Sequence, residues 1–334
     1  MKKITFKLFS LILVVVLILL CSACRSSEPT SGKVPSNTET ESKEPVKLVY
    51  TPEVLIHTTI SNPIARIDGV IINEDQVGDF ELAEDDPYYE ESITVLLGTG
   101  FAEGEKELQL ELNRSMCVEF YRYGIRCVNY SSRYGDVSYI YGTDTILSCS
   151  LLPKYFIKPY ENEIDKQTAE NLALGYIVDL GMTEFKDGVP EGYVIKTSEA
   201  EKREGWESSY SWVTTVTAVS NGRETVEIAE VRVDGYGRLY SFSRSKVYGR
   251  VDARTFPNYS EQEALDAAQQ KLDALIQSAD FGPVAEELHL WRTDYYYVDG
   301  ELVPCLYYAA YVYESDEKTG DPLMIDIRIL IQTE

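Results

Sequence analysis

Two stretches of the chain repeat apolar residues every three to four positions, which is the spacing of one helix face. They are DKQTAENLALGYIVDLG, which starts at Asp165, and SEQEALDAAQQKLDALI, which starts at Ser260. Aspartate and serine are favoured N-cap residues, because their side-chain oxygens accept hydrogen bonds from the free amides of the first helical turn. The pattern therefore predicts one helix near residues 165–180 and another near residues 260–276.

The two predicted helices belong to an internal repeat with an offset of 95 residues, from Asp165 to Ser260. At this offset YSWVTTVTA, from Tyr210, lies over CLYYAAYVY, from Cys305, and both stretches are rich in β-branched and aromatic residues. A further strand-like stretch follows each of them, VEIAEVRVD in the first copy and MIDIRILIQ in the second. We therefore expect two units of about 90 to 95 residues, each a helix packed on an antiparallel sheet.

The first copy also contains a hairpin signal, Asn221 followed by glycine, which suits a two-residue turn with positive φ at both positions. This turn places Trp212 on the sheet face that packs against the helix. Since Tyr307 lies over Trp212 in the repeat, we expect Tyr307 to face the second helix and Tyr308 to point outward.

Tyrosine dominates the aromatic residues, with 25 copies against 10 phenylalanines and 3 tryptophans. Tyrosine suits sheets with one wet face, because the ring packs while the hydroxyl reaches water. Aromatic rings are also enriched where proteins bind partners. The candidate partner surface consists of Tyr308, Tyr296 and Tyr139.

Residues 48–158 contain no copy of the repeat. Short apolar runs such as SITVLL, CVEFYRY and TILSCSLL, separated by Gly, Asp and Pro, predict a separate domain that is mostly β. Cys117 and Cys127 flank VEFYRYGIR, which can fold back at Gly124 and bring the two thiols together. A disulfide between them is possible, although an oxidising location permits such a bond without demanding it.

The N-terminus, MKKITFKLFSLILVVVLILLCSAC, has a basic start, an apolar middle and small residues at its end, which is typical of a secretory signal. Its apolar run, residues 8–20, would be about 20 Å long as a helix, which is too short to cross a bilayer of about 30 Å. Ser22 and Ala23 before Cys24 resemble the lipobox of bacterial lipoproteins, although Cys21 stands where that family usually has leucine. The alternative is an ordinary secretory signal with an accidental cysteine.

The lipobox resemblance implies cleavage before Cys24, acylation of Cys24 and stable attachment to the extracytoplasmic face of the cell membrane by two acyl chains. Residues 25–47 are rich in Ser, Thr, Glu, Pro and Lys and poor in apolar residues, so they predict a disordered tether. The bilayer would be contacted through the acylated cysteine alone.

The formal net charge of −24 argues against nucleic acid and anionic headgroups as partners. The sequence has two histidines, no H-E-x-x-H zinc motif and no G-x-S-x-G nucleophile motif. Acidic pairs such as Asp85 and Asp86 are interpreted as solvated loops. We therefore expect no catalytic residue, no metal and no cofactor.

The repeat resembles PepSY-like domains through Ser260-Glu-Gln-Glu-Ala, the helix that follows it, a hairpin and the strand LVPCLYYAAYVY. PepSY-like domains are helix-on-sheet units of exported bacterial proteins, often in tandem, and similar units occur in accessory regulators of cell-wall sensor kinases. The resemblance covers residues 160–334 at most. It implies binding or regulation of a protein partner in the envelope or membrane, and it transfers no active site.

Together these observations predict an α+β protein with a mostly β N-terminal domain followed by two tandem PepSY-like units. The predicted function is that of a membrane-anchored, non-enzymatic, protein-binding or regulatory lipoprotein. The alternative is an envelope carbohydrate-binding protein or a carboxylate-dependent hydrolase. The predicted parts are the signal peptide 1–23, the tether 24–47, the β domain 48–158, the first unit 159–250 and the second unit 251–334.

The anchor is testable by replacing Cys24. Cys24→Ser removes the thiol that would carry the acyl chains, so the protein should move from the membrane to the soluble fraction and lose all labelling by a radioactive or clickable fatty acid. Cys21→Leu, which restores the residue usual in lipoproteins, is the control and should stay membrane-bound. A Cys24→Ser protein that still sediments with membranes would contradict the lipobox interpretation.

Overall fold

The computed structural model describes residues 47–57, 71–72, 77–96, 107–200, 207–279, 283–313 and 323–334. Among these residues are two α-helices, α2 (Lys166–Asp179) and α3 (Glu261–Ala279). The strands, in chain order, are β1 (Leu48–His57), β2 (Ile71–Ile72), β3 (Val77–Asp79), β4 (Ser92–Leu96), β5 (Glu107–Leu112), β6 (Val118–Phe120), β7 (Ile125–Ser132), β8 (Gly135–Ile140), β9 (Ile146–Leu151), β10 (Tyr193–Ala200), β11 (Ser211–Ser220), β12 (Arg223–Asp234), β13 (Leu239–Arg244), β14 (Val284–Val298), β15 (Glu301–Val312) and β16 (Leu323–Thr333).

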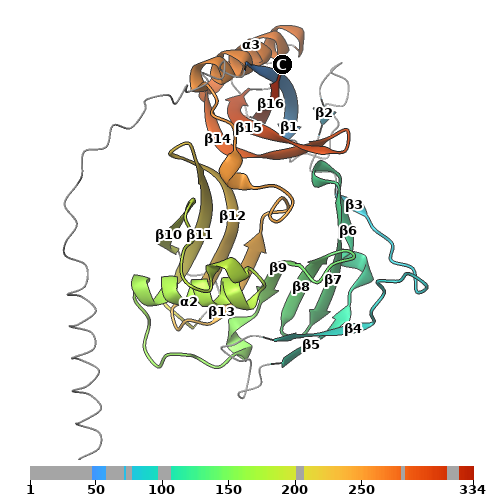
Figure 1. Ribbon diagram of the computed structural model, residues 1–334, viewed down its shortest axis with the longest axis vertical. Coiled ribbons are helices and arrows are strands. Elements are labelled where there is room, and N and C mark those ends of the chain that lie inside the picture. The colour runs from blue at the N-terminus through green and yellow to red at the C-terminus, as the bar shows by residue number, and fades with distance from the viewer. Residues whose placement is uncertain are drawn as a thin grey trace, which may run out of the picture. The chain divides into compact units, whose positions relative to one another are not determined.

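These strands form two sheets (Figure 1). The larger sheet has 11 strands in the order β10-β11-β12-β13-β9-β8-β7-β5-β4, with β3 and β6 attached beside β7. The smaller sheet has 5 strands in the order β14-β15-β16-β1-β2. All pairs are antiparallel except the short pair β1–β2. Helix α2 packs on β10, β11 and β12, and α3 packs on β1, β14, β15 and β16.

The predicted fold class is wrong. The chain is mostly β and is built on two large sheets, not on tandem helix-on-sheet units. Strand β13 of the first copy continues into the N-terminal strands by pairing Phe242 with Cys149, and β16 of the second copy pairs with β1 from Leu48–Thr333 to His57–Met324. The pairing partners were missed because a strand's composition does not say which free edge it will join. Whether residues 48–158, 159–250 and 251–334 fold independently stays a prediction.

The two helices themselves are where the apolar spacing placed them. Asp165 caps α2 by accepting a hydrogen bond from the amide of Thr168 at 2.8 Å. Ser260 caps α3 in the same way, since its hydroxyl oxygen accepts from the amide of Glu263 at 3.3 Å. Both predicted helices are confirmed.

The first hairpin has the predicted turn, with φ of 51° at Asn221 and 77° at Gly222. Trp212 is buried in the core, and its indole N–H donates to the carbonyl of Ile164 at 3.2 Å, just before α2. Its cross-strand partner is Val233, and two register shifts lie between this pair and the turn. The predicted turn and the inward position of Trp212 are therefore confirmed.

The second copy reverses the predicted faces of β15. Tyr308 is 3% exposed and belongs to the same core as Ala264 and Ala268 of α3, whereas Tyr307 joins Cys305 in a separate cluster. Tyr308 is therefore not a surface residue. The offset of 95 holds for the helices, but β15 lies one residue out of phase, and a slip of one residue moves every side chain of a strand to the opposite face.

A buried ion pair joins the two sheets. Its arginine, Arg122, lies in a short 3-10 turn, η3 (Tyr121–Tyr123), between β6 and β7. The Arg122 Nη2 atom lies 3.1 Å from the Asp294 Oδ2 atom of β14, and the Tyr123 hydroxyl donates to the same oxygen at 2.8 Å. The Arg122 guanidinium also lies 4.2 Å from the centre of the Tyr307 ring. The two charged side chains are 7% and 9% exposed, and the Arg292 Nε atom lies 4.0 Å from the same Asp294 oxygen, so Asp294 is the buried counter-charge of this junction.

Removing one partner of this pair should destabilise the whole fold. Asp294→Asn removes the charge of the buried carboxylate that Arg122 faces, and the free energy of unfolding in urea should fall by about 3 to 5 kcal/mol. The matched control is Glu286→Gln on the same strand, which is exposed and should change stability by less than about 0.5 kcal/mol. The double variant Arg122→Met with Asp294→Leu should recover much of the loss, because it removes both buried charges of the pair together. A loss for Asp294→Asn no larger than that of the control would contradict this role.

Candidate functional site

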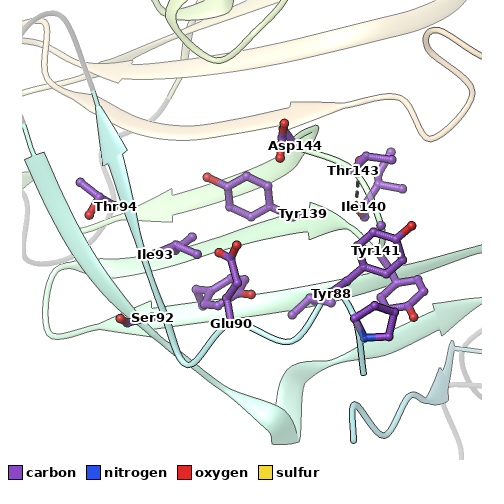
Figure 2. A pocket seen from close by; sticks show the side chains of 14 residues that line it. Tyr88, Glu90, Ser92, Ile93, Thr94, Tyr139, Ile140, Tyr141, Thr143 and Asp144 are labelled. Carbon is purple, nitrogen blue, oxygen red and sulfur yellow. Dashed lines mark hydrogen bonds between the residues drawn. The ribbon is translucent and has the colours of Figure 1, made fainter. Parts of the chain in front are cut away.

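A cleft of about 710 Å³ opens at the N-terminal part of the larger sheet (Figure 2). Its walls come from Pro87, Tyr88 and Glu90 before β4, from Ser92, Ile93 and Thr94 of β4, from Val128 and Tyr130 of β7, and from residues 139–144 at the end of β8 and in the turn that follows. We call it the tyrosine cleft, after Tyr88, Tyr130, Tyr139 and Tyr141 in its lining.

The sheet leaves room for the cleft because β5 pairs with β7 at only two positions, Glu111 with Ser131 and Leu112 with Tyr130. The hairpin of β4 and β5 is paired along its length, from Ser92–Glu111 to Leu96–Glu107. The hairpin is thus joined to the sheet at one end, and the tyrosine cleft lies between β4 and the strands β7 and β8.

Asp86 positions two of the four tyrosines. One of its carboxylate oxygens accepts from the backbone amide of Tyr88 at 2.9 Å, and the other accepts from the hydroxyl of Tyr141 at 2.8 Å. The rings of Tyr88 and Tyr141 meet edge to face, with their centres 5.3 Å apart. Phe80 packs edge to face against Tyr141 as well, at 5.0 Å. Asp86, which is half-buried, therefore has a structural role in this turn, whereas its neighbour Asp85 is exposed.

The turn after β8 completes the rim. Gly142 has φ of +75°, and a Cβ atom there would come within 3.5 Å of the Tyr88 ring. The hydroxyl of Thr143 donates to the carbonyl of Ile140 at 2.8 Å, and the amide of Thr145 donates to that hydroxyl at 3.1 Å. These bonds hold the turn that carries Asp144, which is exposed.

Tyr139 forms the middle of the cleft. It lies half-buried on β8, and its ring meets that of the buried Tyr130 edge to face at 6.0 Å. Figure 2 shows Tyr139 with Asp144 on one side and Glu90 on the other. Burial raises the pKa of Tyr139 to about 12, with further contributions from the Tyr130 phenol and from the carboxylates of Asp144 and Glu90. Burial, followed by Glu90, likewise raises the pKa of Tyr130 to about 12. Both phenols are therefore neutral hydrogen-bond donors at physiological pH.

The three tyrosines of the predicted partner surface do not come together. Tyr139 lines the tyrosine cleft, whereas Tyr308 is buried in the core of the smaller sheet. Tyr296 is half-buried on β14, where the Arg328 guanidinium lies 3.4 Å from its ring centre. Of the three, only Tyr139 belongs to the candidate site.

Cys117 and Cys127 are both free thiols in the structure, so the possible disulfide is not formed. The register of β6 and β7 pairs Val118, not Cys117, with Cys127, which leaves the two cysteines one residue out of step. Both are buried, and burial raises the pKa of each thiol, to about 12 for Cys127. Neither is suited to act as a nucleophile, because the reactive form of cysteine is the thiolate.

The remaining expectations concern metals, histidines and the membrane. Within the described ranges, no group of three His, Cys, Asp or Glu side chains is arranged to hold a metal ion. His289 is exposed on β14, where its ring Nδ1 lies 3.3 Å from the carbonyl oxygen of Glu287. In the part of the chain that the structure describes, no helix combines the length and apolar character needed to cross a bilayer. Cys24 and the predicted tether as far as residue 46 lie outside the described residues.

Comparison of the chain with protein-family models, with curated proteins and with solved structures gives no match. The function must therefore be argued from the geometry of the chain itself.

The tyrosine cleft was missed from sequence because its walls come from segments that were interpreted separately. DDPYYE, residues 85–90, and YGTD, residues 141–144, are the local signals, since each combines turn residues with tyrosine and acid. Their meeting depends on the pairing of β8 with β7 and on the bond from Tyr141 to Asp86, which no local pattern encodes.

The electrostatics of the cleft predict how Tyr139 titrates. Its phenol should ionise near pH 12, against about 10 for an exposed tyrosine. Because the pKa is raised on folding, this contribution to stability is complete below pH 10 and is lost as the pH rises toward 12. Glu90→Gln with Asp144→Asn should bring the pKa of Tyr139 partway back toward 10, since burial remains.

The measurement is ¹³C NMR of protein labelled at the tyrosine Cζ atom, with Tyr139 assigned by the loss of its signal in Tyr139→Phe. An ordinary pKa for Tyr139, or a pKa unchanged in the double variant, would show that the two carboxylates do not act on this ring.

Proposed function

We propose that the protein is a non-enzymatic binding lipoprotein, held on the extracytoplasmic face of the cell membrane by acylated Cys24, which binds an envelope or membrane protein in its tyrosine cleft. The observation that carries the proposal is the cleft itself, a preformed concavity of about 710 Å³ lined by four tyrosines. Its volume lies within the range of about 300 to 1,000 Å³ that ligand pockets occupy.

Tyrosine suits this role for a physical reason. Its rigid ring gives a large contact area while only two torsions are immobilised, and its hydroxyl can donate to a partner's backbone or side chains. Tyr88 is 53% exposed at the mouth of the cleft, whereas Tyr130 is 5% exposed at its base. A partner that enters the cleft would therefore meet aromatic surface from rim to floor.

The segment that carries Tyr88 is held in place by contacts with the neighbouring residues, which favours binding without large rearrangement. Leu82, which precedes this segment in the chain, is buried, and the amide of Leu112 donates to the carbonyl of Glu91 at 2.9 Å. On the outer side of that segment, Arg114 Nη2 lies 3.2 Å from Glu84 Oε1 and 3.0 Å from the Tyr89 hydroxyl oxygen.

A second function has one specific observation in its favour. Glu90 and Asp144 flank Tyr139 in an aromatic cleft (Figure 2), and glycoside hydrolases use two carboxyl groups beside the scissile bond. The alternative is therefore a carbohydrate-binding protein or a carboxylate-dependent hydrolase that uses this same cleft.

Site-specific crosslinking in intact cells tests the proposal. A photoreactive benzophenone amino acid replaces Tyr88 in the full chain, and a matched probe replaces Tyr155, which is 37% exposed and does not line the cleft. Position 88 should give a discrete protein adduct that position 155 does not give. Adding Tyr139→Leu should reduce the yield of that adduct at least about fivefold, because it removes the central ring.

Equal adducts from both positions, or none from position 88, would contradict binding in the cleft. The hydrolase alternative is tested in parallel by incubating the purified full chain with peptidoglycan fragments and soluble glycans. Turnover that disappears in Glu90→Gln or Asp144→Asn would replace the proposal with the hydrolase.

A further inference from the structure

The charge of the tyrosine cleft is one-sided. Its lining contains two acidic residues, Glu90 and Asp144, and no Lys, Arg or His. Neither carboxylate forms an ion pair or a hydrogen bond with any residue that the structure describes. Because both side chains are exposed and lie in a cavity, their charge is available to a molecule that enters from solvent.

No Lys or Arg that the structure describes lies over the rings of the cleft, although such contacts occur beside it. Beside the cleft, the Arg114 guanidinium lies 5.2 Å from the centre of the Tyr89 ring, and that of Arg126 lies 5.1 Å from the centre of Phe80. Over the described ranges, no Lys or Arg is found over any of the four cleft tyrosines. These two guanidinium groups thus lie on rings that do not line the cleft, and the rings of the cleft remain open to an external cation.

We propose that the tyrosine cleft recognises a positively charged segment of the partner protein and places a lysine or arginine side chain against Tyr139, between Glu90 and Asp144. This inference rests on the proposed function, since it names the chemistry of the partner that the cleft binds. The face of an aromatic ring attracts a cation through its quadrupole, and the two carboxylates add direct charge attraction.

Charge complementarity favours a basic segment over an acidic or a neutral one. An acidic peptide would be repelled by both carboxylates and by the net charge of −24. A neutral segment could pack on the rings, but it would leave two carboxylates partly desolvated without a partner, which costs free energy. A basic segment satisfies the rings and the carboxylates together.

The test uses the full chain in non-ionic detergent and three synthetic peptides of equal length: acetyl-(Lys-Gly)₄-amide, its Gln counterpart and its Glu counterpart. The Lys peptide should bind at least about tenfold more tightly than the Gln peptide in 150 mM salt, and the Glu peptide should not bind measurably. Affinities are measured by isothermal titration, and ¹³C-labelled tyrosine reports whether Tyr139 is the ring that shifts.

A matched pair of charge variants separates the cleft from the general acidity of the surface. Glu90→Gln with Asp144→Asn removes the two cleft charges and should weaken the Lys peptide about tenfold. Asp266→Asn with Asp273→Asn removes two exposed charges from α3 and should weaken it less than twofold. Far-UV circular dichroism and urea unfolding confirm that each variant is folded.

The ring is tested separately from the carboxylates. Tyr139→Leu removes the aromatic face and should weaken the Lys peptide about fivefold, whereas Tyr139→Phe keeps that face and should recover most of the loss. Similar losses in the two variants would mean that no cation lies on the ring.

The failure of this inference can be distinguished from the failure of the proposed function. If the Gln peptide binds as tightly as the Lys peptide, or if the cleft and α3 charge variants behave alike, the inference is overturned while partner binding in the cleft still stands. If no peptide binds, the inference is overturned as well. The proposed function falls with it only if the probe at position 88 also gives no specific adduct.

Discussion

The buried pair of Arg122 and Asp294 ties the two sheets together and, through η3, fixes the start of β7. An isolated charge in such a place would cost several kcal/mol, so the pair is useful only as a complete unit. The carboxylate of Asp294 and the ring face of Tyr307 contact the Arg122 guanidinium, and the hydroxyl of Tyr123 donates a hydrogen bond to Asp294. The same strand, β7, continues to Val128 and Tyr130 on the wall of the tyrosine cleft. The junction of the sheets and the candidate site thus share one strand, and a loss of order at its start would reach the cleft.

The cleft shows how one residue type can serve structure and recognition together. Tyr141 is held by Asp86 through its hydroxyl and by Phe80 and Tyr88 through its ring, so its position is set before any partner arrives. Tyr139 has fewer constraints and lies half-buried between two acids. Preorganised aromatic surface lowers the conformational cost of binding, because fewer torsions must be immobilised in the complex. An assembly of this kind favours a binding role, since its polar groups are placed to orient a ligand.

The sequence was informative wherever the signal was local. Apolar spacing and N-cap residues located both helices, and Asn221 with glycine located the first hairpin turn, because each of these features depends on neighbours a few residues away. Strand partners were not accessible, since the edges of β9 and β1 were as suitable as any other for β13 and β16. Tyr308 was assigned to the wrong face because helices tolerate a small error in alignment whereas a strand inverts with a shift of one residue. The cleft required all of these long-range pairings, so only its separate turn signals were visible.

The distribution of positive charge supports the argument for a cationic partner. The chain has 31 Lys and Arg against 55 Asp and Glu. Four arginines, Arg122, Arg238, Arg244 and Arg328, are less than 9% exposed, so their charges are used inside the protein. Three of them face carboxylates, as in the pair of Arg238 with Asp234. Exposed basic residues also lie over aromatic rings or beside acids, as Arg114 does next to the cleft. Most basic side chains in the described ranges thus already have a partner, and no described basic residue pairs with the two acids of the cleft. A partner that supplies a lysine or arginine would therefore provide the positive charge that the lining of the cleft lacks.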